Sequence, residues 1–172
     1  MARGTGVLNE YVVGVNQPVT SPDKNVVSNK GGAVIGVAFS FETEAADGAG
    51  SKYRLIRMGA NWVPLFLELN CDALTGATEV DLGIYDTLEH GGAVKDIDAF
   101  MDGVNISAGY AIDSEINALS ALALANIGKD IFTLAGDSHP TPDGEYDLVL
   151  TMVSEIAAAG TISFRGEFAK NA

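Results

Sequence analysis

Alternation of apolar and polar residues is the feature that most constrains the fold of this chain. It is clearest over residues 78–85, where Val80, Leu82 and Ile84 alternate with polar or small neighbours. A two-residue period is that of a β-strand with one face buried, because successive side chains point to opposite sides of a sheet. The same period recurs in two later segments, residues 146–153 and 161–169.

Further segments rich in β-branched and aromatic residues predict additional strands at 33–42, 52–58 and 62–70. Pro64 places the start of the last of these at a sheet edge or a bulge, because proline has no N–H to donate. With 20 glycines and 5 prolines, the chain has frequent turns between these segments. We expect about six to eight strands, which favours a mainly β fold, an antiparallel β-sandwich of the jelly-roll type.

One α-helix is predicted as an insertion in this sandwich, over residues 113–128. Ser114 can cap it, Glu115 lies where the helix dipole favours negative charge, and Gly128 can end it. Apolar residues between these ends follow helical spacing. After the Gly91-Gly92 turn, at residues 93–100, we expect a short acidic helix or coil.

The 172 residues suffice for one domain, predicted over residues 33–172. Residues 1–32 lack periodicity and contain Pro18 and Pro22, so they are predicted to form an extended N-terminal arm. Their valine and tyrosine content favours an arm held by a partner over a disordered tail. The candidate partner-binding residues are Arg3, Tyr11, Val12, Val13, Lys24, Val26, Val27 and Lys30.

Charge excludes one large class of partners. The net charge is −13, and residues 59–172 carry −14 of it while residues 1–58 carry +1. A nucleic-acid-binding surface needs clustered lysine and arginine, so no nucleic-acid partner is expected. No stretch approaches the roughly 18 apolar residues of a membrane span, and the N-terminus lacks a secretory signal pattern. We therefore expect synthesis in a cytosol and no membrane partner.

Reactive side chains do not form a recognisable catalytic or metal-binding pattern. His90 and His139 have no cysteine or histidine at metal-ligand spacing, and Cys71 is the one cysteine. The spacing of Asp96, Asp98 and Asp102 does not match a calcium-binding loop. We expect no enzymatic activity, no catalytic residue, no metal and no cofactor.

The order of small motifs along residues 33–168 resembles a family of virion structural proteins of tailed bacteriophages, of the capsid decoration or cement type. The motifs are Tyr53-Arg54, Gly59-Ala60, Cys71-Asp72, residues 76–78, 81–85, 91–94 and 98–100, and a closing pair of strands over 145–168. The resemblance implies a protein made in the host cytoplasm and placed in the virion, on the outer capsid surface. It implies the major capsid protein as partner, a homo-oligomer that is a dimer or trimer, and no catalytic residues.

Two other functions stay open at this point. One is a tail or baseplate component of the same virion. The other is a carbohydrate-binding β-sandwich module, which needs an exposed aromatic platform, for which Trp62, Tyr85 and Tyr110 are the candidates. A hydrolase is the least favoured reading, because no nucleophile motif accompanies either histidine.

Overall fold

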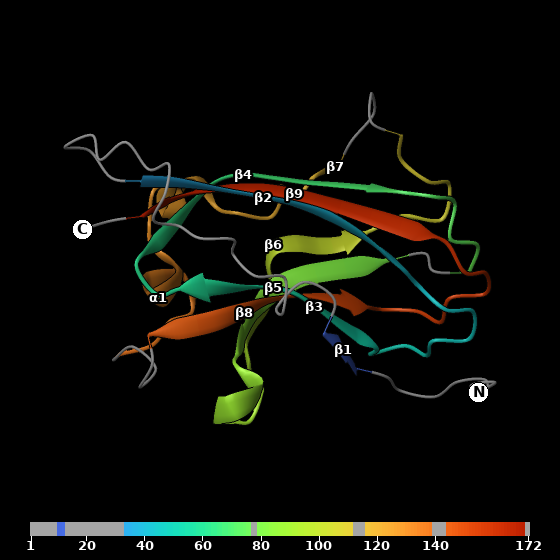
Figure 1. Cartoon of the computed structure of the whole chain (residues 1–172), viewed down its shortest axis with the longest axis horizontal. Helices are drawn as coiled ribbons and strands as arrows, with labels where there is room; N and C mark the ends of the chain where they lie inside the picture. The colour runs from blue at the N-terminus through green and yellow to red at the C-terminus, as the bar shows by residue number, and fades with distance from the viewer. Residues whose placement is uncertain (1–9, 13–32, 77–78, 112–115, 139–143, 171–172) are drawn as a thin grey trace.

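The computed structural model describes residues 10–12, 33–76, 79–111, 116–138 and 144–170. Two β-sheets stack as the upper and lower layers of Figure 1. The nine strands within these ranges are β1 (Glu10–Val12), β2 (Ala33–Glu42), β3 (Lys52–Gly59), β4 (Trp62–Cys71), β5 (Val80–Asp86), β6 (Val94–Val104), β7 (Ile116–Asn117), β8 (Glu145–Met152) and β9 (Thr161–Lys170). Short helical turns are η1 (Leu88–His90), η2 (Leu124–Asn126) and α1 (Ile131–Leu134).

The strand order confirms the predicted antiparallel sandwich and gives it jelly-roll connectivity. One sheet has the order β2-β9-β4-β7, and the other has the order β1-β3-β8-β5-β6. Among β2 to β9, every pair of neighbouring strands is antiparallel. From β2 to β9, successive strands lie in opposite sheets except for the hairpin of β5 and β6, and the first strands pair with the last, as in a double Greek key. The strand β1 is an addition, pairing parallel to β3.

The alternation read from the sequence corresponds to the core between the two sheets. Val80, Leu82 and Ile84 are fully buried, as the pattern of residues 78–85 predicts. The rings of Phe41 and Tyr53 lie 5.2 Å apart and join the sheets across this core. The later alternating strands contribute Tyr146, Leu148, Leu150, Met152, Ile162, Phe164 and Phe168, all fully buried.

The outer face of the β3-β8-β5-β6 sheet is covered as well. Arg54 and Asp147 form an ion pair of 2.8 Å there, with each side chain only 1% exposed. Arg54 also donates hydrogen bonds to the carbonyl oxygens of Asp86 and Gly92. The segment that follows β5 therefore folds back over this face, held by one buried cation.

The predicted helix over residues 113–128 is wrong for the part that the structure describes. Ile116 and Asn117 form β7, which pairs with Leu69 and Glu68 at the edge of β4. The Asn117 side chain then accepts a hydrogen bond from the backbone N–H of Leu119. Such a local turn competes with helical hydrogen bonds, and the open edge of β4 satisfies the backbone instead. Residues 113–115 lie outside the described residues.

The segment after Gly91-Gly92 also differs from expectation. Residues 94–104 form the long strand β6 rather than a short acidic helix or coil. Its pairing with β5 is interrupted by three register shifts, which break the two-residue period that would reveal a strand. Within the described residues, no helix is long and apolar enough to cross a membrane.

Candidate interaction surfaces

Of the predicted partner-binding arm, residues 1–32, the structure describes one short strand. Tyr11 and Val12 belong to β1, whose backbone lies in register with Tyr53 and Arg54 of β3. This strand covers one edge of the five-stranded sheet. The other candidates, Arg3, Val13, Lys24, Val26, Val27 and Lys30, lie outside the described residues. Partner binding by the arm stays a prediction.

The outer face of the β2-β9-β4-β7 sheet is open, in contrast to the covered face of the other sheet. We call this surface the open face. Gly36, Ala38 and Ser40 of β2 are exposed there, and their side chains are small. Two shallow hollows lie along it, both lined by Ala38 and Arg165. The remaining outward residues are Val34, Glu42, Phe66, Glu68, Asn70, Ser163 and Glu167.

A polar cluster of Glu68, Asn70 and Arg165 occupies the centre of the open face. Glu68 is only 2% exposed, and it accepts hydrogen bonds from Asn70 Nδ2 at 2.7 Å and from Arg165 Nε at 2.9 Å. Burial favours a higher pKa for Glu68, but these hydrogen bonds and the Arg165 charge outweigh it, so the pKa lies below its ordinary value. The carboxylate and the guanidinium thus neutralise each other at neutral pH.

An apolar groove borders the open face between β4 and the segment that follows β7. Three large apolar side chains that line it, Leu65, Phe66 and Ile127, are 51%, 43% and 65% exposed. Large side chains that are exposed together, rather than singly, mark surfaces that are covered in an assembly. The groove is lined by Pro64, Leu65, Phe66, Glu68, Asn117, Leu119, Leu122 and Ile127.

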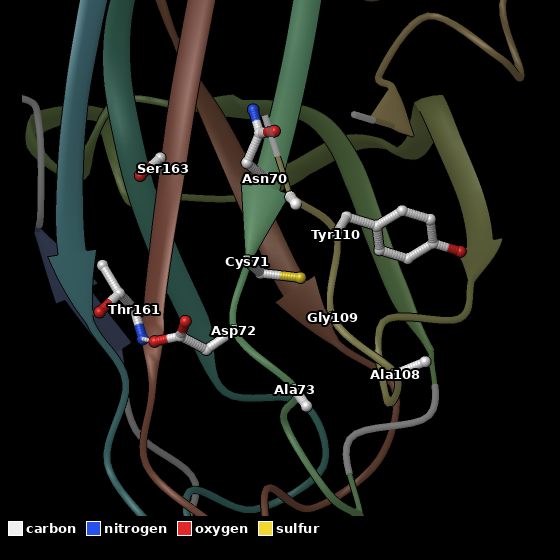
Figure 2. A pocket seen from close by; sticks show the side chains of 10 residues that line it. Asn70, Cys71, Asp72, Ala73, Ala108, Gly109, Tyr110, Thr161 and Ser163 are labelled. Atoms are coloured by element: carbon white, nitrogen blue, oxygen red, sulfur yellow. Dashed lines mark hydrogen bonds between the residues drawn. The ribbon is translucent and has the colours of Figure 1, made fainter. Parts of the chain in front are cut away.

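A further hollow lies at the end of β4, shown in Figure 2. Cys71 and Tyr110 exchange backbone hydrogen bonds of 3.0 and 2.7 Å, and Asp72 Oδ2 accepts one from the Thr161 N–H at 2.9 Å. Gly109 has a left-handed φ of 76° and passes so close to the Ala73 backbone that a Cβ would collide with it. The polar groups here thus hold the loop at residues 108–110 against the end of β4.

Catalytic side chains do not come together in the described part of the chain. Burial raises the pKa of the Cys71 thiol, which opposes formation of a nucleophilic thiolate. His90 Nδ1 is hydrogen-bonded to Thr87 Oγ1 at 2.8 Å, and His139 lies outside the described residues. Across the described ranges, no group of three or more acidic, cysteine or histidine side chains could hold a metal ion.

The three aromatic residues considered for sugar binding do not form a platform. Tyr85 is fully buried. Trp62 begins β4 and packs on Phe168 with ring centroids 5.4 Å apart, whereas Tyr110 lies at the other end of that strand, beside Cys71. Stacking on a sugar ring needs an exposed aromatic face. Tyr85 offers none because it is buried, and the other two side chains lie at opposite ends of β4.

The fold defines the class, a jelly-roll β-sandwich with one open face. The sequence matches no protein-family model and no curated protein. Two solved structures share the fold. A chain from the capsid of Ralstonia phage GP4 has a TM-score of 0.55 and 14% identity, with 90% of this chain and 95% of that chain covered. A chain from the cyanophage Pam1 capsid asymmetric unit has a TM-score of 0.50 and 11% identity, with coverage of 87% and 99%.

Proposed function

We propose that this chain is a virion structural protein that decorates and stabilises the outer surface of a tailed-phage capsid. The observation that carries the proposal is the match with the Ralstonia phage GP4 capsid, which covers 90% of this chain and 95% of the other. Because nearly all of each chain is covered, the two chains are of comparable size and the similarity is not confined to one part of either. The motif order along residues 33–168 supports the same reading independently of the fold.

The described surfaces are suited to a function exerted through contact area. The open face has a neutral polar centre in Glu68 and Arg165, and an apolar groove with the exposed side chain of Ile127 borders it. A protein that binds only the assembled shell stabilises that shell by mass action, without any reactive group. We propose the major capsid protein as the partner, with no enzymatic activity, no cofactor and no nucleic-acid or membrane partner.

The acidic charge of the chain fits exposure on a particle surface. Residues 59–172 carry a net charge of −14. A strongly negative outer surface keeps large particles soluble, because they repel one another at close approach. The near-neutral N-terminal third is then the part better suited to docking. This arrangement supports a location on the head surface after synthesis in the host cytoplasm.

A tail or baseplate component is the second candidate, because the fold alone is compatible with any position in the virion. Copy number separates the two locations, since a head protein repeats over the whole shell and a baseplate protein occurs in few copies. The carbohydrate-binding alternative loses support from the burial of Tyr85.

Deleting residues 2–32 tests the role of the arm. We expect the truncated protein to lose binding to capsid particles in a sedimentation assay while the domain over residues 33–172 stays folded by circular dichroism. The deletion also removes β1 and uncovers the edge of β3. A shorter deletion, residues 2–9, keeps β1 and is the matched control, which should retain most of the binding. Unchanged occupancy with the longer deletion contradicts a docking arm.

A further inference from the structure

The two sheets have four edges, and three of them are protected against pairing with another chain. β1 covers β3, and β7 is only two residues long. β6 has three register shifts in its pairing with β5 and carries Lys95, Asp96, Asp98 and Asp102. Coverage, shortness, bulges and charges are the devices by which native proteins prevent unwanted strand pairing.

The fourth edge, β2, has none of these devices within the described residues. It is ten residues long and pairs with β9 without any register shift. The strand contains neither proline nor lysine, and its one charged residue, Glu42, is at its end. An edge of this kind presents a row of backbone donors and acceptors to any strand of matching length.

Hydrogen bonding at the end of β2 shows which backbone groups face outward. The Thr43 N–H donates to the Gly160 carbonyl at 2.8 Å, continuing the β2–β9 register. In an antiparallel pair, the backbone N–H and C=O groups of one residue point toward the partner strand, and those of the next residue point away from it. The backbone N–H and C=O groups of the odd-numbered residues of β2 therefore point toward β9. The N–H and C=O groups that face the free edge belong to Val34, Gly36, Ala38, Ser40 and Glu42.

Side chains at the centre of this edge leave room for a second strand. Gly36 has no atom within 4 Å of the position that a Cβ would occupy. Ala38 and Ser40 are small and exposed. The larger side chains, Val34 and Glu42, stand at the two ends of the strand. Side-chain size along this edge is thus distributed nearly symmetrically about Ala38.

We propose that β2 pairs with β2 of a second copy of this chain, antiparallel, across a two-fold axis at Ala38. Ala38 then lies opposite its counterpart, Gly36 opposite Ser40, and Val34 opposite Glu42. A two-fold contact uses the same patch on both copies, which is what this symmetric strand offers. The result is one continuous eight-stranded sheet, with both open faces on the same side.

Charge selects this antiparallel arrangement over a parallel one. Each copy carries −13, so like charges must stay apart at the contact. Eight residues separate Val34 from Glu42, which places the two Glu42 carboxylates roughly 27 Å apart at about 3.4 Å per residue. This exceeds the Debye length of about 8 Å at physiological salt, so their repulsion is screened. A parallel pair would place the two Glu42 side chains next to each other.

Cysteine cross-linking of the purified full-length protein tests the pairing and its register. In Ala38→Cys, the two cysteines face each other at a Cα separation of about 5.5 Å, within the disulfide range of about 4.4–6.8 Å. In the control Gly36→Cys, the two cysteines lie about 14 Å apart, four residues out of register. The native Cys71 is buried.

We expect covalent dimers from mild oxidation of Ala38→Cys and at least tenfold fewer from Gly36→Cys. Equal cross-linking of both variants, or more from Gly36→Cys, overturns the proposed register. A protein that sediments as a monomer at all concentrations and gives no cross-link overturns the proposal altogether. An edge covered from within the same chain gives that monomeric result.

A proline pair provides a second measurement. Ala38→Pro removes an N–H that faces the free edge, so we expect loss of the dimer with little change in the thermal midpoint of the monomer. Val37→Pro removes an N–H that faces β9, so it should lower that midpoint strongly. The test uses the isolated protein and does not depend on capsid binding, so its failure leaves the proposed virion function standing. A dimer that persists in Ala38→Pro contradicts pairing through β2.

Discussion

Replacing Arg54 with methionine should lower the free energy of unfolding by about 3–5 kcal/mol, the usual cost of removing one partner from a buried ion pair. Arg54 and Asp147 are each 1% exposed and lie 2.8 Å apart. The substitution leaves the Asp147 carboxylate with the longer ion pair to Arg57, at 3.5 Å. For a chain of this length, the thermal midpoint should fall by about 6–20 °C. Denaturant titration and calorimetry measure the two quantities.

Two controls show whether the loss comes from an uncompensated charge. Arg57→Gln alters a cation that is itself 27% exposed and whose other partners, Glu89 and Glu145, are 66% and 41% exposed, so the cost should stay near 1 kcal/mol. The double variant Arg54→Met with Asp147→Leu removes both charges and should recover most of the loss. If the single variant Arg54→Met unfolds like the native protein, the buried pair does not hold the covering segment in place.

Replacing Gly83 with alanine should cost about 3 kcal/mol, at the upper end of the range for overpacking. A Cβ at this position would collide with the carbonyl oxygens of Asp96 and Ile97. These are backbone atoms of β6, so no side-chain rotation can relieve the overlap. The residue must therefore stay without a side chain for β6 to cross the outer face of β5. Chemical denaturation gives the loss directly.

Gly36→Ala is the matched control on the opposite sheet. A Cβ there meets no atom within 4 Å. The same chemical change should therefore leave the stability within about 0.5 kcal/mol, as for other exposed positions. Comparable losses in Gly36→Ala and Gly83→Ala would show that the effect does not come from the collision with β6.

The sequence predicted the sandwich because its core strands keep a strict two-residue period. Val80, Leu82 and Ile84 alternate without a break, and all three are fully buried between the sheets. Tyr85 on the opposite face is buried as well, because that face of the sheet is covered. The period fails where the backbone is irregular. β6 departs from this period because, at each bulge, additional residues of β6 lie opposite a single residue of β5. The sequence of β6 therefore resembles an acidic coil.

The helix over residues 113–128 failed for a different reason. Local spacing of apolar residues cannot show that β4 has an open edge, which Ile116 pairs with. Leu119 and Leu122 then line the apolar groove, and Leu124 and Ile127 are exposed instead of forming one buried stripe. The first part of the predicted apolar stripe, from Ile116 to Leu122, thus packs against the core, and only its end is surface.

The candidate surfaces were predictable only in part. The arm stood out in the sequence because it lacks periodicity, and β1 places Tyr11 and Val12 at a sheet edge. The open face could not be predicted, because it depends on which sheet the segment after β5 covers. The cluster of Glu68 and Arg165 likewise arises from the pairing of β4 with β9, between residues 97 positions apart.

The most direct test of the capsid proposal is the position of this chain in a density map of the intact virion that contains it. The account predicts many copies on the outer surface of the head shell, each in contact with the major capsid protein. Density for the chain confined to the tail or baseplate would contradict decoration of the capsid.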